Sequence, residues 1–505
     1  MRRPLTDGKR PTVLEFFSTF VWDEYYFPMD ASFQNYTYFP AASTARIRGC
    51  WTRTLELIRR GQAPPHLGLY IHWPYCPSQC TYCYCSMAVP KSRAELAGHL
   101  AMLKREMDSL KDLFRGVEFS SVWLGGGTPT FMEDAQLDDL LGHARASFVL
   151  GAHAQVYVES SPATLTASKL AILLKHGVNR LTLGIQTLDE GVLAHIDRAG
   201  QRARAAKALL RLLTDTPGLV TDVDLMVGLE GQTPVSFLRD LTQILKIGPA
   251  ALHLFAFNER PQTLFSREGK TLDAAQRRRL ATLMALADKI IAKHGYRSPV
   301  VDTESMQLDS AEEKQDGAVR KFGGSVLGLG YSAISHAFGS AWYYHPLAAA
   351  GGKALDDPPP YFALSSGLHE EMRGYALRHL SLYLRISRAS FRTLFGKDPM
   401  AVRPLKSVFE EWVRSGVVAI DSATIRWVDS DPVRRRVLLK NLYSDKVVRL
   451  LLRAREEGFA RFEDEKRRSP DAWRLAVQAK SEARSLFRVY QKPKAAVPPR
   501  LEIAA

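Results

Sequence analysis

Short apolar segments alternate with longer amphipathic segments along the middle of the chain. The short segments are rich in β-branched and other apolar residues, as β-strands are, and the longer ones carry apolar residues at helical spacing. Alternation of this kind predicts β-α units that build a parallel sheet. The predicted strands are 67–73, 120–126, 154–159, 180–186, 221–227 and 251–257. The predicted helices are 92–113, 166–176, 202–214, 234–247 and 273–293.

Six strands joined by short loops favour an incomplete barrel over a closed barrel of eight strands. The periodicity does not distinguish this barrel from an open doubly wound sheet. In both architectures, polar residues at the carboxyl ends of the strands form the site. We therefore expect an α/β fold: a partial (β/α)6 barrel with an irregular N-terminal segment and a mainly helical, winged-helix-like C-terminal domain.

The rest of the chain divides into segments of different character. Residues 1–66 are aromatic-rich and irregular in pattern, and the barrel is predicted over 67–350. A stretch rich in Gly, Asp and Pro at 351–359 breaks the pattern and marks a boundary. Beyond it, 351–455 is predicted to be a helical domain with one hairpin around 417–427. Residues 456–505 are predicted to be a basic helical tail.

The formal net charge of +15 is concentrated near the C-terminus, where residues 431–505 carry 19 Lys and Arg against 10 Asp and Glu. Such a surface can bind an anionic partner, or it can be a solvated helical face. The specific partner that we expect is an acidic electron donor such as a flavodoxin or ferredoxin, and nucleic acid is the less favoured partner. Neither a signal peptide nor a membrane-spanning run is visible, so a cytoplasmic location is expected.

Four of the five cysteines, Cys76, Cys80, Cys83 and Cys85, lie within ten residues. This clustering indicates metal binding in a reducing compartment rather than a disulfide framework. The first three form a CxxxCxxC pattern, and thiolates are the ligands that iron–sulfur clusters require. Three thiolates on four irons leave one iron open to bind an amino and a carboxylate group. Zinc is the alternative, but a zinc site would need a second pair of ligands that the sequence does not supply.

The segment from Leu69 to Cys85 resembles the radical S-adenosylmethionine (SAM) superfamily. More narrowly, it resembles oxygen-independent coproporphyrinogen III oxidase (coproporphyrinogen dehydrogenase) and its relatives, over most of the chain. The motif Gly125-Gly126-Gly127-Thr128 is similar to the turn that contacts SAM in that family. Glycines there let the backbone approach a ligand, and exposed N–H groups can meet the ligand's polar atoms. The resemblance implies reductive cleavage of SAM to a 5′-deoxyadenosyl radical, which removes hydrogen from a small-molecule substrate.

The resemblance also implies which residues hold two SAM molecules beside a 4Fe–4S cluster on Cys76, Cys80 and Cys83. The cluster-bound molecule would contact Tyr70, Gly126, Glu159 and Ile334. The second would contact Tyr82, Gly127, Thr128, Gln186, Arg198 and Asp224. Tyr70 and Cys85 are the candidate catalytic residues. Cys85 extends the motif to CxxxCxxCxC, as in the dehydrogenases, and we expect that it is not a cluster ligand. The alternative to a catalytic role is that Cys85 is simply a free, buried thiol.

Several departures from the family pattern fall in segments that face the substrate. Asn35 replaces an arginine, Glu230 replaces a proline, and 301–305 lacks a histidine. We therefore interpret the chain as a paralogue that retains the SAM residues and has a rebuilt substrate site. Oxidative decarboxylation of a tetrapyrrole-like substrate is the leading hypothesis, and methyl transfer or cyclopropanation of class C type is the alternative. A haem-trafficking chaperone, with His72, His253 and His336 as candidate haem contacts, ranks third.

Overall fold

The computed structural model describes residues 41–85, 87–198, 200–257, 259, 263–296, 324–344, 361–430, 435, 438–446 and 487–492. They form one sheet of twelve strands, in the order β1-β11-β10-β9-β8-β2-β3-β4-β5-β6-β7-β15, and a separate sheet of three. The predictions for Asn35, for residues 301–305 and for the boundary at 351–359 lie outside the described residues, as do those for most of the tail.

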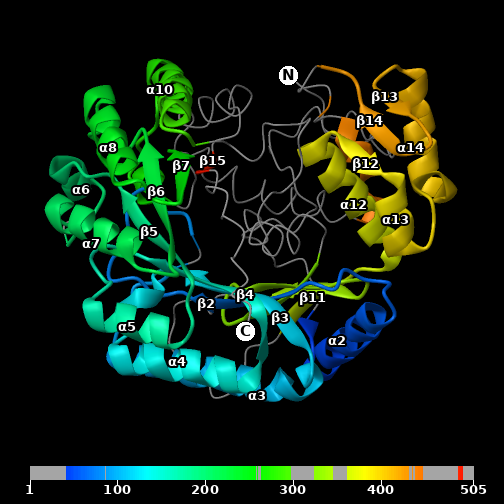
Figure 1. Ribbon diagram of the computed structural model, residues 1–505, viewed down its shortest axis with the longest axis horizontal. Coiled ribbons are helices and arrows are strands. Elements are labelled where there is room, and N and C mark those ends of the chain that lie inside the picture. The colour runs from blue at the N-terminus through cyan, green and yellow to red at the C-terminus, as the bar shows by residue number, and fades with distance from the viewer. Residues whose placement is uncertain are drawn as a thin grey trace, which may run out of the picture.

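The strand order distinguishes between the two architectures that the sequence left open. Strands β2 to β7 are neighbours in chain order and run parallel. Crossovers between parallel strands are right-handed in nearly all proteins, so an unreversed order puts the connecting helices on one face of the sheet. A doubly wound sheet reverses its order and carries helices on both faces. Figure 1 shows the helices on the outer side of a curved sheet, which confirms the partial barrel.

The predicted strands and helices of the barrel agree closely with the observed ones, except that β4 begins earlier. The helices Asp134–Ser147, Glu190–His195 and Leu264–Arg267 were not among those predicted. The barrel strands are β2 (Leu67–Trp73), β3 (Glu118–Gly126), β4 (Val149–Ser160), β5 (Arg180–Gln186), β6 (Val220–Val227) and β7 (Ala251–Ala256). The helices are α3 (Arg93–Leu110), α4 (Asp134–Ser147), α5 (Ala167–Lys175), α6 (Glu190–His195), α7 (Ala203–Asp215), α8 (Pro234–Ile247), α9 (Leu264–Arg267) and α10 (Ala274–Lys293). Short 3-10 turns η2 (Lys111–Phe114) and η3 (Pro129–Phe131) follow α3 and β3.

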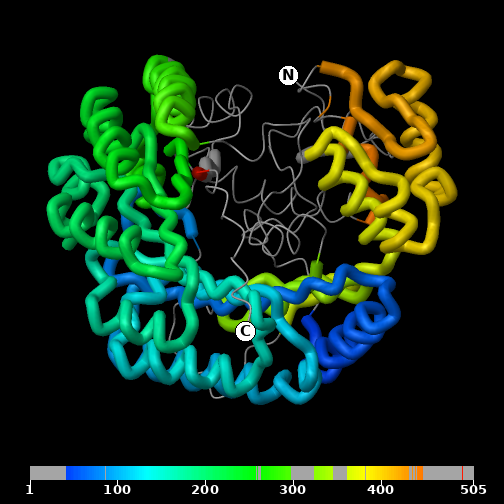
Figure 2. Tube along the Cα trace, in the orientation of Figure 1, coloured from blue at the N-terminus to red at the C-terminus, as the bar shows by residue number. Residues whose placement is uncertain are grey.

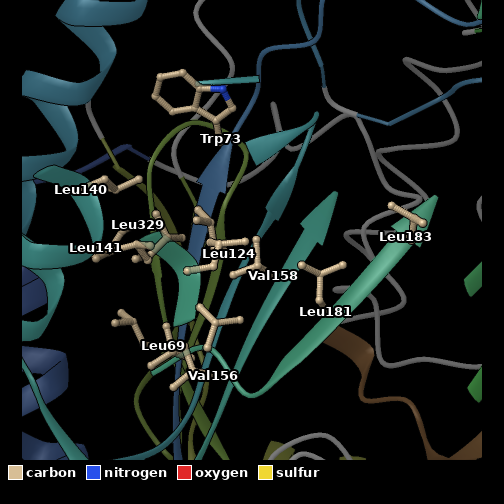
Figure 3. Packing of buried hydrophobic residues seen from close by; sticks show 14 of the residues in the cluster. Leu69, Trp73, Leu124, Leu140, Leu141, Val156, Val158, Leu181, Leu183 and Leu329 are labelled. Carbon is tan, nitrogen blue, oxygen red and sulfur yellow. The ribbon is translucent and has the colours of Figure 1, made fainter. Parts of the chain in front are cut away.

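The outer face of the barrel sheet is apolar. Side chains alternate between the two faces of a strand, and one set from each barrel strand belongs to a continuous buried cluster. Figure 3 shows Leu69, Leu124 and Val158 on the side of the sheet that faces Leu140 and Leu141 of α4. Burial of these side chains against the helices drives formation of the sheet and fixes its register, because a slip of one residue would exchange the two faces.

The inner face of the same strands is aromatic and polar. The Tyr70 ring lies edge-on to Trp123 with centroids 5.3 Å apart, and Trp123 lies edge-on to Tyr157 at 5.4 Å. The Tyr157 hydroxyl hydrogen-bonds the hydroxyl of Thr182 on the next strand. Buried polar groups require hydrogen-bond partners, and the polar side chains of this face can find them only inside the barrel. A polar ligand can therefore bind there.

Strand β8 (Ser325–Leu329) extends the sheet on the other side of β2 and runs parallel to it. This strand was not among the six predicted from the sequence. Three antiparallel strands follow β8, and the N-terminal strand completes the edge: β9 (Ile334–Ala337), β10 (Ala341–Tyr344), β11 (Tyr361–Ser365) and β1 (Ala41–Ala42).

The N-terminal segment is not irregular throughout, because α2 (Thr44–Arg59) lies within it. Ser43 caps this helix by accepting a hydrogen bond from the Arg46 N–H at 3.3 Å. Its buried face anchors it to the added strands: the Trp51 Nε1–H donates to the Tyr343 hydroxyl at 2.6 Å. The prediction of an irregular segment was wrong for these residues because their apolar spacing is helical, a signal that the abundance of aromatic residues nearby obscured.

The C-terminal module has the element order of a winged helix. Its order is α12 (Leu368–Tyr383), β12 (Arg385–Ser387), α13 (Arg388–Phe395), η4 (Pro399–Ala401), α14 (Arg403–Arg414), β13 (Val418–Ile420), β14 (Thr424–Trp427) and η5 (Lys440–Leu442). Strand β14 lies between β12 and β13, so the predicted hairpin is confirmed. The module has its own buried cluster, centred on Phe409, Trp412 and Trp427, and Figure 2 shows it in yellow and orange as a separate lobe.

Within the predicted helical tail, the described residues form a strand instead. β15 (Phe487–Gln491) pairs antiparallel with β7, so that Val489 lies opposite His253. Phe487, Val489 and Tyr490 are residue types that are common in strands. None of the described helices is long and apolar enough to span a bilayer.

Replacement of Trp412 by alanine tests the core of the C-terminal module. Trp412 is fully buried, so Trp412→Ala should lower the free energy of unfolding by about 3–5 kcal/mol. Val413, its neighbour on α14, is 44% exposed, and Val413→Ala should cost about 0.5 kcal/mol or less. Urea unfolding followed by tryptophan fluorescence and circular dichroism measures both. Equal effects of the two substitutions would contradict the burial described here.

Candidate active site

The three motif cysteines lie on the loop that leaves the carboxyl end of β2. Cys76, Cys80 and Cys83 are partly buried, and Cys85 is exposed. The Cys83 N–H donates to the Cys80 carbonyl at 3.0 Å and so closes a turn between them. The Cys76 N–H donates to the carbonyl of Ala88 at 3.0 Å, where the chain returns alongside Tyr75. The loop therefore folds back on itself and holds its sulfur atoms at the rim of the barrel.

The cysteines differ in how readily they lose a proton. Burial raises the pKa of Cys76 to about 12, and burial also raises the pKa of Cys80, against the opposing charge of Arg198. A hydrogen bond from Cys85 lowers the pKa of Cys83 to about 7. Cys83 is therefore the thiol that is ionised most easily, and a bound metal would have to displace protons from the other two.

The donor set fits an iron–sulfur cluster. Among the residues that the structure describes, no three His, Cys, Asp or Glu side chains lie close enough to bind one metal ion. Thiolates on a cluster bind different irons, so they stand further apart than the ligands of a single ion. Three soft sulfur donors on one tethered loop meet the requirement of a cluster, and they are the residues that would hold it.

The glycine turn after β3 lies directly against the cysteine loop. The Gly127 N–H donates to Trp73 O at 2.7 Å and the Thr128 N–H to Tyr75 O at 2.9 Å. The Thr128 hydroxyl is 3.2 Å from the Cys76 sulfur. A side chain on Gly127 would place its Cβ 2.7 Å from the carbonyl oxygens of Pro74 and Tyr75. Only glycine permits this approach, and Gly127 and Thr128 are thus placed beside the cysteines.

Glu159, at the end of β4, supports the same turn. Its carboxylate accepts hydrogen bonds from the Gly126 N–H and from Trp123 Nε1, both at 3.2 Å. Gly126 has φ of 116°, and a Cβ there would lie 2.8 Å from the His72 ring. The N–H groups of Gly126, Gly127 and Thr128 are therefore all used within the protein. The expectation that exposed N–H groups of this turn meet a ligand was wrong for these three residues.

Tyr70 and Ile334, the other residues assigned to the cluster-bound SAM, lie on β2 and β9, with β8 between these two strands. The Tyr70 hydroxyl is 2.8 Å from His72 Nδ1, on the inner face of β2. Ile334 begins β9, after a loop in which Gly330 packs so closely that a Cβ would lie 2.7 Å from His72 O. The buried carboxylate of Glu106 holds this loop by accepting the Gly330 N–H at 2.8 Å.

Four of the residues assigned to the second SAM are connected around Gly184 of β5. Arg198 donates to the Tyr82 hydroxyl at 2.8 Å and to the Gly184 carbonyl at 2.6 Å. A Cβ on Gly184 would lie 3.1 Å from Gln186 Nε2 and 3.9 Å from Asp224 Oδ2. Both side chains therefore converge over the glycine, where the missing Cβ leaves room.

Gln186 carries two signs of a binding residue. Its φ is 64°, a left-handed conformation that is uncommon for a residue with a side chain. Its Oε1 atom is buried and has no hydrogen-bond partner among the described residues. An acceptor buried without a donor costs free energy, so this amide oxygen is suited to a ligand that brings a hydroxyl or an N–H group.

Of the two candidate catalytic residues, Cys85 lies close to the cluster ligands. Its thiol hydrogen-bonds Cys83 and is near enough to Glu159 and Cys76 for their charges to raise its pKa. Cys85 is exposed, so the alternative of a buried thiol was wrong. Tyr70 lies deeper, between His72 and Trp123.

Sequence reasoning did not identify the polar residues beneath the rim as part of the site. Arg180 and Asp222 form a bidentate ion pair, with distances of 2.7 and 3.2 Å, on the inner face of β5 and β6. His253 on β7 bonds Asp224 at 2.9 Å. Side chains two residues apart in a strand lie on the same face of the sheet, so the sequence could have placed the carboxylate of Asp222 on the same face as that of Asp224. His253 was considered only as a haem contact.

Comparison with known proteins gives a family model, "Radical SAM superfamily", over residues 70–244. The chain is 30% identical over 292 residues to oxygen-independent coproporphyrinogen III oxidase of Escherichia coli (strain K12), covering 56% of this chain and 63% of that relative. It is also 30% identical over 201 residues to heme chaperone HemW of the same organism, covering 40% of this chain and 53% of that relative. The chain thus spans less than two thirds of the length of either relative.

Among solved structures, coproporphyrinogen III oxidase (HemN) from Escherichia coli aligns with a TM-score of 0.61 at 21% sequence identity. The alignment covers 77% of this chain and 93% of that chain. It shows that the fold is shared. The family match includes the cysteine loop, the glycine turn and the ends of β4, β5 and β6, whereas His253 and Ile334 lie beyond it.

Single cysteine substitutions test which thiols bind iron. After anaerobic reconstitution with iron and sulfide, the wild-type protein should hold about four irons per chain, and Cys76→Ala, Cys80→Ala and Cys83→Ala should each lose most of them. Cys50 lies buried in α2, outside the loop, so Cys50→Ala is the matched control and should keep its iron. Iron and sulfide analysis with visible absorbance measures the content.

Cys85→Ala is the discriminating variant in the same series. It should retain iron as Cys50→Ala does, because the three motif cysteines suffice. Loss of iron from Cys85→Ala to the level of Cys80→Ala would show that the ligand set assigned here is wrong.

Proposed function

We propose, from the radical SAM domain that residues 70–244 form, that this protein is an enzyme that cleaves SAM reductively and removes a hydrogen atom from an organic substrate. Domains of this superfamily hold a 4Fe–4S cluster and SAM. The observation that carries the proposal is the junction of the cysteine loop and the glycine turn, where Thr128 lies 3.2 Å from the sulfur of Cys76. At this junction, the sulfur ligands lie next to a glycine turn whose backbone can approach a ligand closely, at the rim of the barrel.

When bound, the cluster would supply the electron that splits the carbon–sulfur bond of SAM. The residues of this chain would hold that cofactor in place. Because the N–H groups of Gly126, Gly127 and Thr128 are already used, we assign binding of the ammonium group to the carbonyl oxygens of the turn. Glu159 would hold the turn in shape through its hydrogen bond from the Gly126 N–H. Tyr70 and Trp123 would shield the reacting atoms from water.

The second set of residues supports binding of a second SAM molecule. Tyr82, Arg198 and the Gly184 carbonyl form one hydrogen-bonded chain, beside which Asp224 and Gln186 converge. Arg198 is a cation near the thiols of Cys80 and Cys76, and it suits the carboxylate of an amino acid. Asp224 and the unpartnered Gln186 Oε1 suit hydroxyl donors.

Oxidative decarboxylation of a coproporphyrinogen-like substrate is the leading specific reaction. It is supported by the similarity to the coproporphyrinogen III oxidase of Escherichia coli and by Cys85 next to the cluster ligands. Methyl transfer or cyclopropanation would use the same two cofactor sites. The products differ, since decarboxylation releases carbon dioxide and methyl transfer releases S-adenosylhomocysteine.

The candidate haem contacts are committed to protein partners. His336 lies 3.1 Å from the Gly324 carbonyl through Nδ1 and 2.9 Å from Glu371 through Nε2. His253 bonds Asp224 and His72 lies against Tyr70. These contacts favour the enzyme over the haem-chaperone hypothesis, which the similarity to HemW would otherwise support.

We further infer a cytoplasmic location and an acidic one-electron donor of the flavodoxin or ferredoxin kind. A cluster held by cysteine thiolates needs a reducing compartment. The chain's net charge of +15 suits an acidic protein partner.

An anaerobic assay tests the proposed reaction. The reconstituted protein, given dithionite and SAM, should release 5′-deoxyadenosine, and Cys80→Ala should release at least about a hundredfold less because the cluster ligand is lost. Cys50→Ala should behave as the wild type. Liquid chromatography with mass spectrometry quantifies the products, and addition of coproporphyrinogen distinguishes decarboxylation from methyl transfer. Absence of 5′-deoxyadenosine from protein with a full complement of iron, with or without substrate, would overturn the proposal.

A further inference from the structure

Four polar side chains form a column on the inner face of the barrel, beneath the rim. Arg180 on β5 bonds Asp222 on β6 through two of its nitrogens, at 2.7 and 3.2 Å. His253 on β7 lies between the two carboxylates of β6: its Nδ1 is 2.9 Å from Asp224 Oδ1, and its Nε2 is 4.0 Å from Asp222 Oδ2. The column thus runs from a buried ion pair up to the carboxylate of Asp224.

Burial decreases from the bottom of the column to the top. The side chain of Asp222 is 1% exposed, those of Arg180 and His253 are each 15% exposed, and that of Asp224 is 22% exposed. Arg180 fixes Asp222, and His253 packs on this fixed base. Asp224 is the member that a ligand in the barrel can reach.

The hydrogen bond from His253 sets the orientation of the Asp224 carboxylate. Because Nδ1 is 2.9 Å from Oδ1, the proton on Nδ1 is donated to that oxygen. Burial lowers the pKa of His253, but the bond to Asp224 and the charges of both aspartates outweigh burial and raise it. With Oδ1 held, Oδ2 lies over Gly184, 3.9 Å from where a Cβ would stand, and Gln186 Nε2 lies 3.1 Å from the same point.

We propose that His253 is a positioning residue for the second SAM site: it holds Asp224 through Oδ1 so that Oδ2 is presented to a hydroxyl group of the nucleoside. This inference rests on the proposed function, because it requires that a second SAM binds beside Asp224. It deepens that function by adding a residue on β7, which lies outside the matched domain of residues 70–244. Without the bond, the carboxylate would rotate about its last torsion and lose the geometry that the site needs.

The test compares three substitutions at one position. Asparagine places an amide N–H near the position of Nδ1, whereas glutamine reaches toward the position of Nε2, and alanine provides no donor. His253→Ala and His253→Gln should therefore weaken binding at the second site about tenfold or more, as expected for a lost hydrogen bond to a charged group. His253→Asn should restore the affinity to within about threefold of the wild type.

Binding is measured on the reconstituted, unreduced protein by anaerobic equilibrium dialysis with radiolabelled SAM, so no turnover is needed. The wild type should bind two molecules per chain, and the variants should keep the affinity of the cluster-bound molecule. Thermal unfolding of each variant shows whether the fold is kept. Selective loss at one site, with rescue by asparagine and not by glutamine, is a result that a purely structural role of His253 would not give.

The outcomes separate this inference from the proposed function. If the wild type binds two SAM molecules and His253→Ala binds both with unchanged affinity, the positioning role is overturned and the two-cofactor function stands. Equal loss of both molecules in all three variants would also overturn it, because His253 would then support the fold. A single molecule bound to the wild type would overturn the second site itself, and with it the role assigned to His253.

Discussion

The backbone hydrogen bonds that join the end of β2 to the turn after β3 are the interaction on which the rest of the site depends. Gly127 and Thr128 donate to the carbonyl groups of Trp73 and Tyr75, at 2.7 and 2.9 Å. These bonds hold the loop with Cys76 and the glycine turn together through contacts of the protein alone, and a side chain at Gly127 would clash with them. Preorganisation of this kind lowers the cost of ordering a loop around a cofactor.

The two faces of the sheet connect this local contact to the whole fold. The outer face buries Leu, Val and Ile against the helices, and the register that it fixes determines which residues point inward. Glu159, Gly184 and Asp224 therefore reach the rim from neighbouring strands at similar heights. Deeper polar groups such as Arg180 and Asp222 are paired with each other, so neither charge is left buried without a partner.

Much of this architecture was predictable from local pattern. The six barrel strands and the cysteine loop follow from periodicity and spacing, since each is encoded within a short stretch. Most of the parts that were missed depend on long-range contacts, whereas α2 was missed although its own apolar spacing is helical. Helix α2 packs on β9 to β11 through Trp51 and Tyr343, and β15 pairs with β7 over a wide sequence separation. The hydrogen bond from the Gly126 N–H to Glu159 could not be predicted from the sequence either, because it depends on how two neighbouring strands lie in space.

The central claim is that three thiolates hold a four-iron cluster and leave one iron for SAM. Electron paramagnetic resonance of the dithionite-reduced, reconstituted protein tests it most directly. The account predicts the signal of a reduced 4Fe–4S cluster, whose g-values shift when SAM is added because the cofactor binds the open iron. A cluster signal that is identical with and without saturating SAM would contradict the account, since every iron would then already have its full set of ligands.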